Sequence, residues 1–252
     1  MPLVVTHKDD PDETRWYASL FDFSTRKKLR VLADPSPEIL EKEIQQPDLI
    51  FSFYYRSMLP MSLLQRARLG AFNLHGSLLP KFRGRAPLNW AILKGETETG
   101  VTLHEMVEKP DAGRIVDQQA VPIGPDENAV EVFHKMTDAA EKVLRRSIGD
   151  LISGKAKLRP NDLSKGSYFG RRRPADGRID WSRSAQEIHD LVRALAPPFP
   201  GAFSENLKIH KTALTGKPHS RSTLGPYQDN GEWFAACGDG KILRLLAVRK
   251  EE

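Results

Sequence analysis

The segment AFNLHGSLLPKFRGRAPLNW occupies residues 71–90, and its first five residues are predicted to form a strand. The glycines and prolines that follow end this strand. Because side chains alternate along a strand, Asn73 and His75 project to one side while Leu74 faces the packed layer. The two polar residues then lie together at the carboxyl end of a strand, where open α/β sheets place their ligand crevices.

Strands and helices alternate on both sides of this segment. The clearest helix covers Asn128 to Ser153, where apolar residues repeat at helical spacing. A cluster from Asp9 to Asp12 is predicted to form a turn or to start a helix. This alternation indicates an α/β fold with a mostly parallel sheet covered on both faces. The other predicted strands are Leu3 to Thr6, Leu49 to Phe53, Val101 to Val107 and Arg114 to Ile123, and the other predicted helices are Pro37 to Gln46 and Leu63 to Leu69.

The helical apolar pattern ends after residue 153, so we predict three parts of the chain. Residues 1–153 form the α/β domain, residues 154–168 form an ordered crossing linker, and residues 169–252 form a small β-rich domain. The last part is predicted to hold a helix from Ser184 to Leu195 and short strands within Ala202 to Leu214 and Trp233 to Val248.

The composition narrows the class of protein. Apolar residues make up 39% and charged residues 28% of the 252 residues, which is typical of a folded globular chain. No run approaches the roughly 18 apolar residues of a membrane helix, and the N-terminus has no signal-peptide pattern. The single cysteine, Cys237, cannot form an internal disulfide. We therefore predict a cytoplasmic protein without membrane insertion. The net charge of +5 suits an anionic substrate or nucleic acid and does not choose between them.

Two features of the site region have more than one interpretation. An Asn and a His after a strand can form a catalytic pair or can simply cap loop backbone. His75, His104 and Asp111 could be drawn as metal ligands. Their spacing matches no compact ligand motif, and the strand of His104 can face solvent, so no metal is predicted.

The run Arg171 to Arg173, with Arg178, could contact an RNA backbone. Because it lies beside Pro174 to Gly177, we predict that it is the solvated shoulder of a turn, and nucleic acid is disfavoured as a partner. No glycine-rich phosphate loop is present, which argues against ATP or nicotinamide chemistry.

The segment from Phe72 to Trp90, with Gly95 to Thr102 and Asp111 to Gly113, resembles the signature of formyltransferases that use N10-formyltetrahydrofolate. Within that family it most resembles the formyltransferase domains of the bifunctional polymyxin-resistance type, which modify UDP-4-amino-4-deoxy-L-arabinose for lipid A biosynthesis. Methionyl-tRNA formyltransferases usually differ at three of these positions, which are Gly76, Arg85 and Ala112. The resemblance continues through Phe169 to Arg172 and Ala236 to Gly240.

This resemblance implies the formyltransferase fold, which has a Rossmann-like domain and a small OB-like C-terminal domain. It assigns Asn73, His75 and Asp111 as the catalytic residues, and their chemistry suits formyl transfer to an amine. Asn73 can donate to the oxyanion, His75 can carry the proton, and Asp111 can orient the imidazole and favour its protonated form. The residues implied to line the folate pocket are Ser57, Met58, Leu59, Arg85, Val107, Glu108, Lys109, Pro110 and Asp111. Arg85 has its own rationale, since a loop guanidinium can pair with a carboxylate or phosphate, although it can equally be solvated.

The resemblance also implies substrates and partners. N10-formyltetrahydrofolate is the expected co-substrate, a UDP-linked aminosugar is the expected acceptor, and a separate decarboxylating dehydrogenase is a further expected partner. Two alternatives stay open, namely a methionyl-tRNA formyltransferase and a non-catalytic folate-binding remnant. Members of the family begin with a strand and helix before the segment equivalent to Leu3 to Thr6. A misassigned start of the chain or a truncation would explain this difference. Because the first strand lies in the middle of such sheets, its loss would leave the two adjacent strands with unpaired backbone groups.

Overall fold

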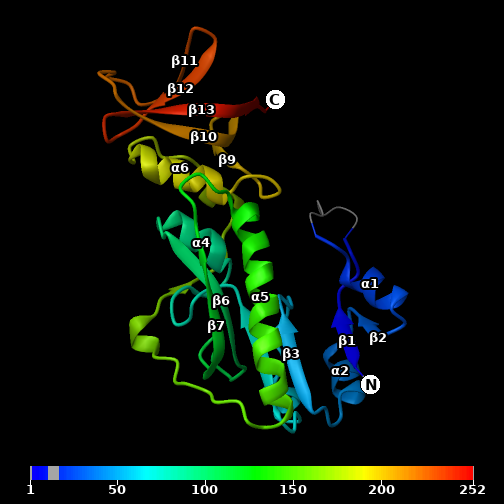
Figure 1. Cartoon of the computed structure of the whole chain (residues 1–252). Helices are drawn as coiled ribbons and strands as arrows, with labels where there is room; N and C mark the ends of the chain where they lie inside the picture. Colours follow the sequence, from blue (N-terminus) through cyan, green and yellow to red (C-terminus); the bar gives the residue numbers. More distant parts are fainter. Residues whose placement is uncertain (1, 11–16, 252) are drawn as a thin grey trace.

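The computed structural model describes residues 2–10 and 17–251, and its N-terminal part is a small parallel unit (Figure 1). Strands β1 and β2 pair in parallel, and each is followed by a helix that a serine caps, with Ser19 before α1 and Ser36 before α2. Of the cluster predicted to start a helix, Pro11 and Asp12 lie outside the described residues, and the first described helix begins at Leu20. The bounds are β1 Leu3–Thr6, α1 Leu20–Arg26, β2 Arg30–Ala33 and α2 Pro37–Glu43.

A second sheet carries the predicted site, with the strand order β3-β4-β6-β7. Strands β3 and β4 are parallel, as the α/β prediction requires, whereas β6 and β7 run antiparallel to their neighbours. The predicted helix from Leu63 to Leu69 ends earlier, because residues after Leu64 turn into β4. The bounds are β3 Leu49–Phe53, α3 Met61–Leu64, β4 Gly70–His75, β5 Arg83–Gly84, α4 Pro87–Leu93, β6 Glu98–Glu105 and β7 Ile115–Pro122.

The two sheets are separate. In the described part of the chain β1 pairs with β2 alone and β3 pairs with β4 alone, so each has one edge without a ladder partner. Side-chain contacts connect the sheets instead. The His7 ring stacks on Tyr55 with centroids 5.1 Å apart, and Arg66 donates to the backbone of α2 at Glu41 over 2.6 Å.

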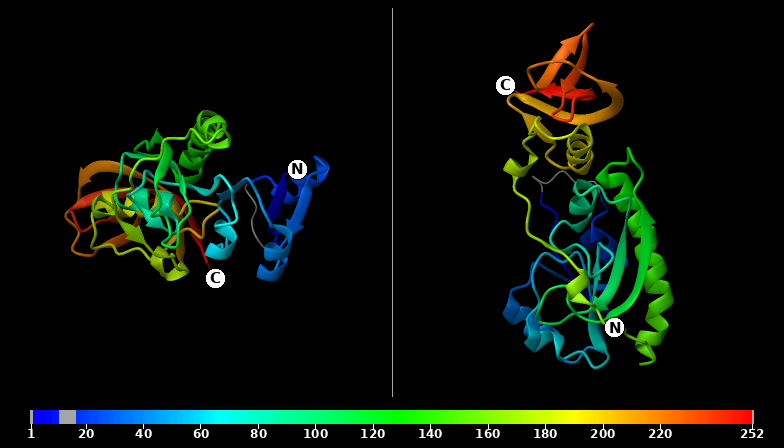
Figure 2. Two further views of the ribbon diagram at one scale, coloured as in Figure 1. Left: turned by 90° about the horizontal axis from the view of Figure 1, so that it is seen from below. Right: turned by 90° about the vertical axis from the view of Figure 1, so that its left-hand side faces the viewer.

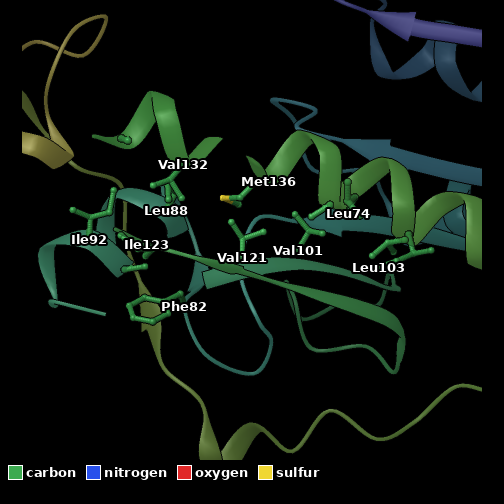
Figure 3. Packing of buried hydrophobic residues seen from close by; sticks show 14 of the residues in the cluster. Leu74, Phe82, Leu88, Ile92, Val101, Leu103, Val121, Ile123, Val132 and Met136 are labelled. Atoms are coloured by element: carbon green, nitrogen blue, oxygen red, sulfur yellow. The ribbon is translucent and has the colours of Figure 1, made fainter. Parts of the chain in front are cut away.

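The long helix α5, Ala129–Ile152, covers one face of the second sheet (Figures 1 and 3). Asn128 caps it and exchanges hydrogen bonds with Glu131, which fixes the start where the sequence predicts it. Each large side chain that the helix buries contributes about 1.5–3 kcal/mol to folding. The core residues labelled in Figure 3 are Leu74, Phe82, Leu88, Ile92, Val101, Leu103, Val121, Ile123, Val132 and Met136.

The C-terminal part is an antiparallel sheet with the order β11-β12-β13-β10-β9, packed against α6 (Figure 2). It has its own core, so the predicted α/β domain with a parallel-rich sheet and a small β-rich domain is confirmed. We propose the predicted division at residues 154–168, although Phe169 still packs on the first core. The bounds are β8 Tyr168–Phe169, α6 Ala185–Ala194, β9 Ala202–Ser204, β10 Leu207–Pro218, β11 Gly225–Asp229, β12 Glu232–Ala236 and β13 Lys241–Lys250, and short 3-10 turns cover Leu163–Lys165 and Pro174–Gly177.

None of the helices in the described ranges is long and apolar enough to cross a bilayer.

Candidate active site

Strand β4 carries the two polar residues that the sequence singles out. Asn73 and His75 line a cavity of about 870 Å³, and Leu74 between them packs into the first core at 5% exposure. Neighbouring β6 runs antiparallel, and its register sets His104 directly opposite Asn73. The alternation along β4 and this register together bring three polar side chains to one face of the sheet.

Asp111 reaches the same place from the loop between β6 and β7. Its Oδ2 accepts a hydrogen bond from the Gly84 backbone N–H over 2.9 Å, and its carbonyl oxygen accepts one from Asn161 over 3.0 Å. Its backbone is left-handed, with a φ of 53°. The loop needs Gly113, because a Cβ there would lie 2.1 Å from the carbonyl oxygen of Glu105. Asp111 is therefore positioned by partners distant in sequence.

The proton on His75 can be located from its partners. Nε2 lies 2.8 Å from the carbonyl oxygen of Phe82, and because a carbonyl only accepts, Nε2 carries the hydrogen. Nδ1 lies 3.4 Å from Oδ1 of Asp111. In the neutral ring this nitrogen has a bare lone pair, so it can take a proton, and the carboxylate beside it stabilises the imidazolium that results.

Burial decides which form of His75 the resting protein holds. The side chain is 7% exposed, and burial lowers the pKa of His75 below its ordinary 6.5, although Asp111 and the Phe82 carbonyl oppose this effect. Asp111 does favour the protonated form, as expected, but desolvation outweighs the carboxylate in the free protein, so the pKa of His75 is lowered overall. For Asp111, burial raises the pKa, but His104, His75 and the Gly84 amide outweigh it, and the pKa stays below 3.8.

This balance gives a prediction for the titration of His75. An NMR titration of the imidazole signals, assigned with the His75→Gln variant, is expected to show a pKa below 6.5. In Asp111→Asn the midpoint should move to lower pH, because that substitution removes the negative charge that favours the imidazolium. A midpoint above 6.5 in the wild type, or an upward shift in the variant, would contradict this account of the site.

His104 belongs to the site, against the prediction that its strand can face solvent. It is 2% exposed, and its Nδ1 donates to the carbonyl oxygen of Glu105 over 2.7 Å. Nε2 is then an acceptor, and the side-chain amide of Asn73 donates to it over 3.3 Å. This contact orients Asn73 and leaves its second N–H for a ligand. The sequence missed His104 because strand alternation does not reveal which face of β6 is covered.

Most residues implied for the folate pocket line the same cavity. Ser57 to Leu59 and Arg85 do so, as do Val107, Glu108 and Pro110, whereas Lys109 is not among the lining residues. Tyr54 and Tyr168 also line the cavity, although neither was predicted as a site residue. Within the described residues, no group of three or more His, Cys, Asp or Glu side chains is arranged to hold a metal ion.

The arginine run was predicted to be a solvated turn; Arg171 is exposed as predicted, and the prediction is wrong for Arg172. Arg171 lines the cavity, and Arg172 is half-buried with its guanidinium 5.1 Å from the Trp90 ring centroid. Arg173 and Arg178 are exposed, as the turn predicts. The pairing of β8 with β5 carries the run toward the site, and that long-range pairing has no local signature.

The fold is shared by solved structures, of which three are compared. WlaRD, a sugar 3N-formyl transferase studied with dTDP and 5-N-formyl-THF, superposes with a TM-score of 0.78 at 24% identity, covering 96% of this chain and 86% of that chain. The N-formyltransferase from Helicobacter canadensis, in complex with folinic acid and dTDP-3-aminofucose, gives 0.78 and 24%, covering 96% and 88%. HypX from Aquifex aeolicus, with tetrahydrofolic acid, gives 0.69 and 19%, covering 99% and 44%. At these identities the likeness establishes the fold.

Two sequence-family models match most of the chain. Residues 172–252 match the formyl transferase C-terminal domain. Residues 3–148, which are more than half of the chain, match the formyl transferase family, and the chain therefore belongs to this family of enzymes.

Proposed function

We propose that the protein transfers a formyl group from N10-formyltetrahydrofolate to the amino group of a nucleotide-linked aminosugar, with UDP-4-amino-4-deoxy-L-arabinose as the acceptor. The observation that carries the proposal is the meeting of Asn73, His75 and Asp111 at the wall of one cavity. Two of the similar structures contain dTDP or a dTDP-linked aminosugar, which supports a sugar nucleotide as acceptor. Lipid A modification is the proposed use of the product, and a separate decarboxylating dehydrogenase is a further proposed partner.

The chemistry follows from the positions of the three side chains. The acceptor amine attacks the formyl carbon, and the second N–H of Asn73 donates to the oxyanion that forms, a contact worth about 3 kcal/mol in comparable sites. Nδ1 of His75 takes the proton from the amine, and Asp111 at 3.4 Å stabilises the imidazolium. His75 then gives this proton to N10 of the folate as the bond between N10 and the formyl carbon breaks. No other proton carrier is required.

The folate side of the cavity is proposed from the resemblance. Ser57, Met58 and Leu59 follow β3, and Val107 to Asp111 follow β6, so both groups leave the sheet beside the catalytic residues. Arg85, next to the Gly84 amide that holds Asp111, is proposed to pair with a folate carboxylate.

The acceptor is supported by one local feature. Gly76 follows His75, and a Cβ at this position would lie 3.2 Å from the Tyr54 hydroxyl and 3.1 Å from Cε of Met136. Gly76 therefore leaves room for the Tyr54 hydroxyl in the cavity. Methionyl-tRNA formyltransferases usually carry a larger residue at the position of Gly76.

Side-by-side assays test the acceptor. With N10-formyltetrahydrofolate, the protein is expected to formylate UDP-4-amino-4-deoxy-L-arabinose, detected as a formyl mass increase with equimolar release of tetrahydrofolate. A dTDP-linked 3-amino sugar is the comparison acceptor, and methionyl-tRNA is the negative control. Turnover of methionyl-tRNA that weakens steeply with salt would identify the tRNA reaction instead. Folate binding without turnover of any acceptor would contradict the catalytic proposal.

A further inference from the structure

One end of the cavity is built by the pairing of β5 with β8. These short strands run in parallel, with Arg83 opposite Tyr168 and Gly84 opposite Phe169. The Arg85 backbone N–H continues the ladder by donating to the carbonyl oxygen of Phe169 over 3.0 Å. This register brings Arg85 close to the segment that holds Arg171. Both side chains line the cavity and are exposed, and neither has a hydrogen bond or ion pair among the described residues.

Arg171 is held at this end by its two chain neighbours. The indole N–H of Trp90 donates to the carbonyl oxygen of Gly170 over 3.2 Å. On the other side, the guanidinium of Arg172 stacks over the same Trp90 ring and donates to the carbonyl oxygen of Asp176 over 2.8 Å. Because both neighbours are fixed on α4, the backbone of Arg171 is fixed as well. Its side chain is therefore presented to the cavity rather than carried on a free loop.

The buried guanidinium of Arg83 adds positive charge near Arg85 and Arg171. Arg83 is 8% exposed, and its Nε and Nη1 have no hydrogen-bond partner among the described residues. Its Cζ lies 5.8 Å from the Tyr168 ring centroid, so the charge is beneath an aromatic side chain that lines the cavity. A buried cation without a carboxylate partner raises the local potential and favours an anionic ligand nearby.

We propose that this end of the cavity binds the phosphate groups of the acceptor nucleotide. Arg171 contacts the phosphates directly, and the buried charge of Arg83 makes the local electrostatic potential more positive. The proposal rests on the proposed function. Two substrates must meet at Asn73 and His75, and the residues after β3 and β6 are proposed for the folate. Of the other lining residues, Ala86, Pro87, Tyr168 and Arg171 are then proposed to face the acceptor, while Arg85 stays assigned to the folate. A planar guanidinium suits a diphosphate because its forked donors match phosphate oxygens.

Calorimetric titration with UDP and with dTDP, neither carrying a sugar, tests this assignment. Arg171→Ala is expected to weaken nucleoside diphosphate binding about tenfold to a hundredfold, as the loss of a charge-assisted hydrogen bond requires. Arg171→Lys should recover part of the affinity, because it keeps the charge but not the fork. Arg173→Ala is the matched control, since it removes one charge from the same run at a residue outside the cavity lining. It should bind like the wild type.

The titrations are repeated with N10-formyltetrahydrofolate, whose glutamate carboxylates are the competing anions. Unchanged folate affinity in Arg171→Ala supports the phosphate assignment, and a loss confined to folate overturns it. Equal weakening in Arg171→Ala and Arg173→Ala also overturns it, because only general charge would then be involved. If the wild type formylates a sugar nucleotide and Arg171→Ala does not weaken nucleoside diphosphate binding, this inference fails while the proposed function stands. Diphosphate binding that depends on Arg171, without turnover, supports the subsite and defeats the proposed function.

Discussion

Replacing His75 by alanine is expected to lower kcat by at least about a hundredfold, since positioned proton carriers typically contribute 10²–10⁴-fold. The reason is geometric. Nδ1 of His75 is a bare acceptor 3.4 Å from the Asp111 carboxylate. Nε2 of His104 also faces this carboxylate, at 3.6 Å, but it already accepts a hydrogen bond from Asn73. Steady-state kinetics with the formylated sugar nucleotide as product measure the loss.

Asp111→Asn is the companion substitution, because it removes the charge while keeping an oxygen that accepts from the Gly84 amide. It should lower kcat to a similar extent, since the imidazolium loses its counter-ion. If the two residues act as a unit, the double variant will be little slower than either single variant. His134→Ala, at an exposed position on α5, is the control and should leave kcat unchanged. Near-normal turnover in His75→Ala or Asp111→Asn would refute the catalytic scheme.

The parts of the fold that were predicted well carry local signals. Helix α5 begins after Asn128 and α6 begins after Ser184, and each cap is recognised from a glutamate three residues later. The antiparallel return from β6 to β7 has no such signal, because strand direction depends on how the loop closes. Strand β11 was not predicted, although the hairpin residues Asn230 and Gly231, both with positive φ, mark its end.

The site was predictable where the residues share one strand and not where they come from different elements. Asn73 and His75 follow from the period of a strand. Asp111 came only from the family resemblance, because its place depends on Gly84 and Asn161, which are 27 and 50 residues away. The position of Arg171 beside the cavity was not predicted, because the contacts that hold its neighbours run to Trp90, about 80 residues earlier. Polar residues in a sequence show what chemistry is available, and long-range pairing decides which of them meet.

The same long-range packing underlies the prediction for the buried Arg193, whose replacement by alanine is expected to be the most destabilising of the substitutions proposed. Arg193 lies in α6 at 7% exposure, and its Nε donates to Asp190, itself 3% exposed, over 2.7 Å. Its Nη1 donates to the carbonyl oxygens of Gly124 and Glu127 over 3.2 and 3.0 Å. Arg193→Ala leaves a buried carboxylate and two carbonyl groups without these donors. The free energy of unfolding should fall by about 3–5 kcal/mol, measured by urea denaturation.

Two further variants separate the buried charge from a general loss of packing. Asp190→Asn in the Arg193→Ala background should recover part of the lost stability, because it removes the unpaired buried charge rather than adding a contact. Arg183→Ala breaks an exposed ion pair between Arg183, which precedes α6, and Glu187 in its first turn, and it should cost no more than about 1 kcal/mol. Equal losses in Arg183→Ala and Arg193→Ala would contradict the structure. Since Gly124 and Glu127 precede α5 while Ile188 and Val192 pack in the C-terminal core, the Arg193 contacts connect the two cores, and their loss should weaken both.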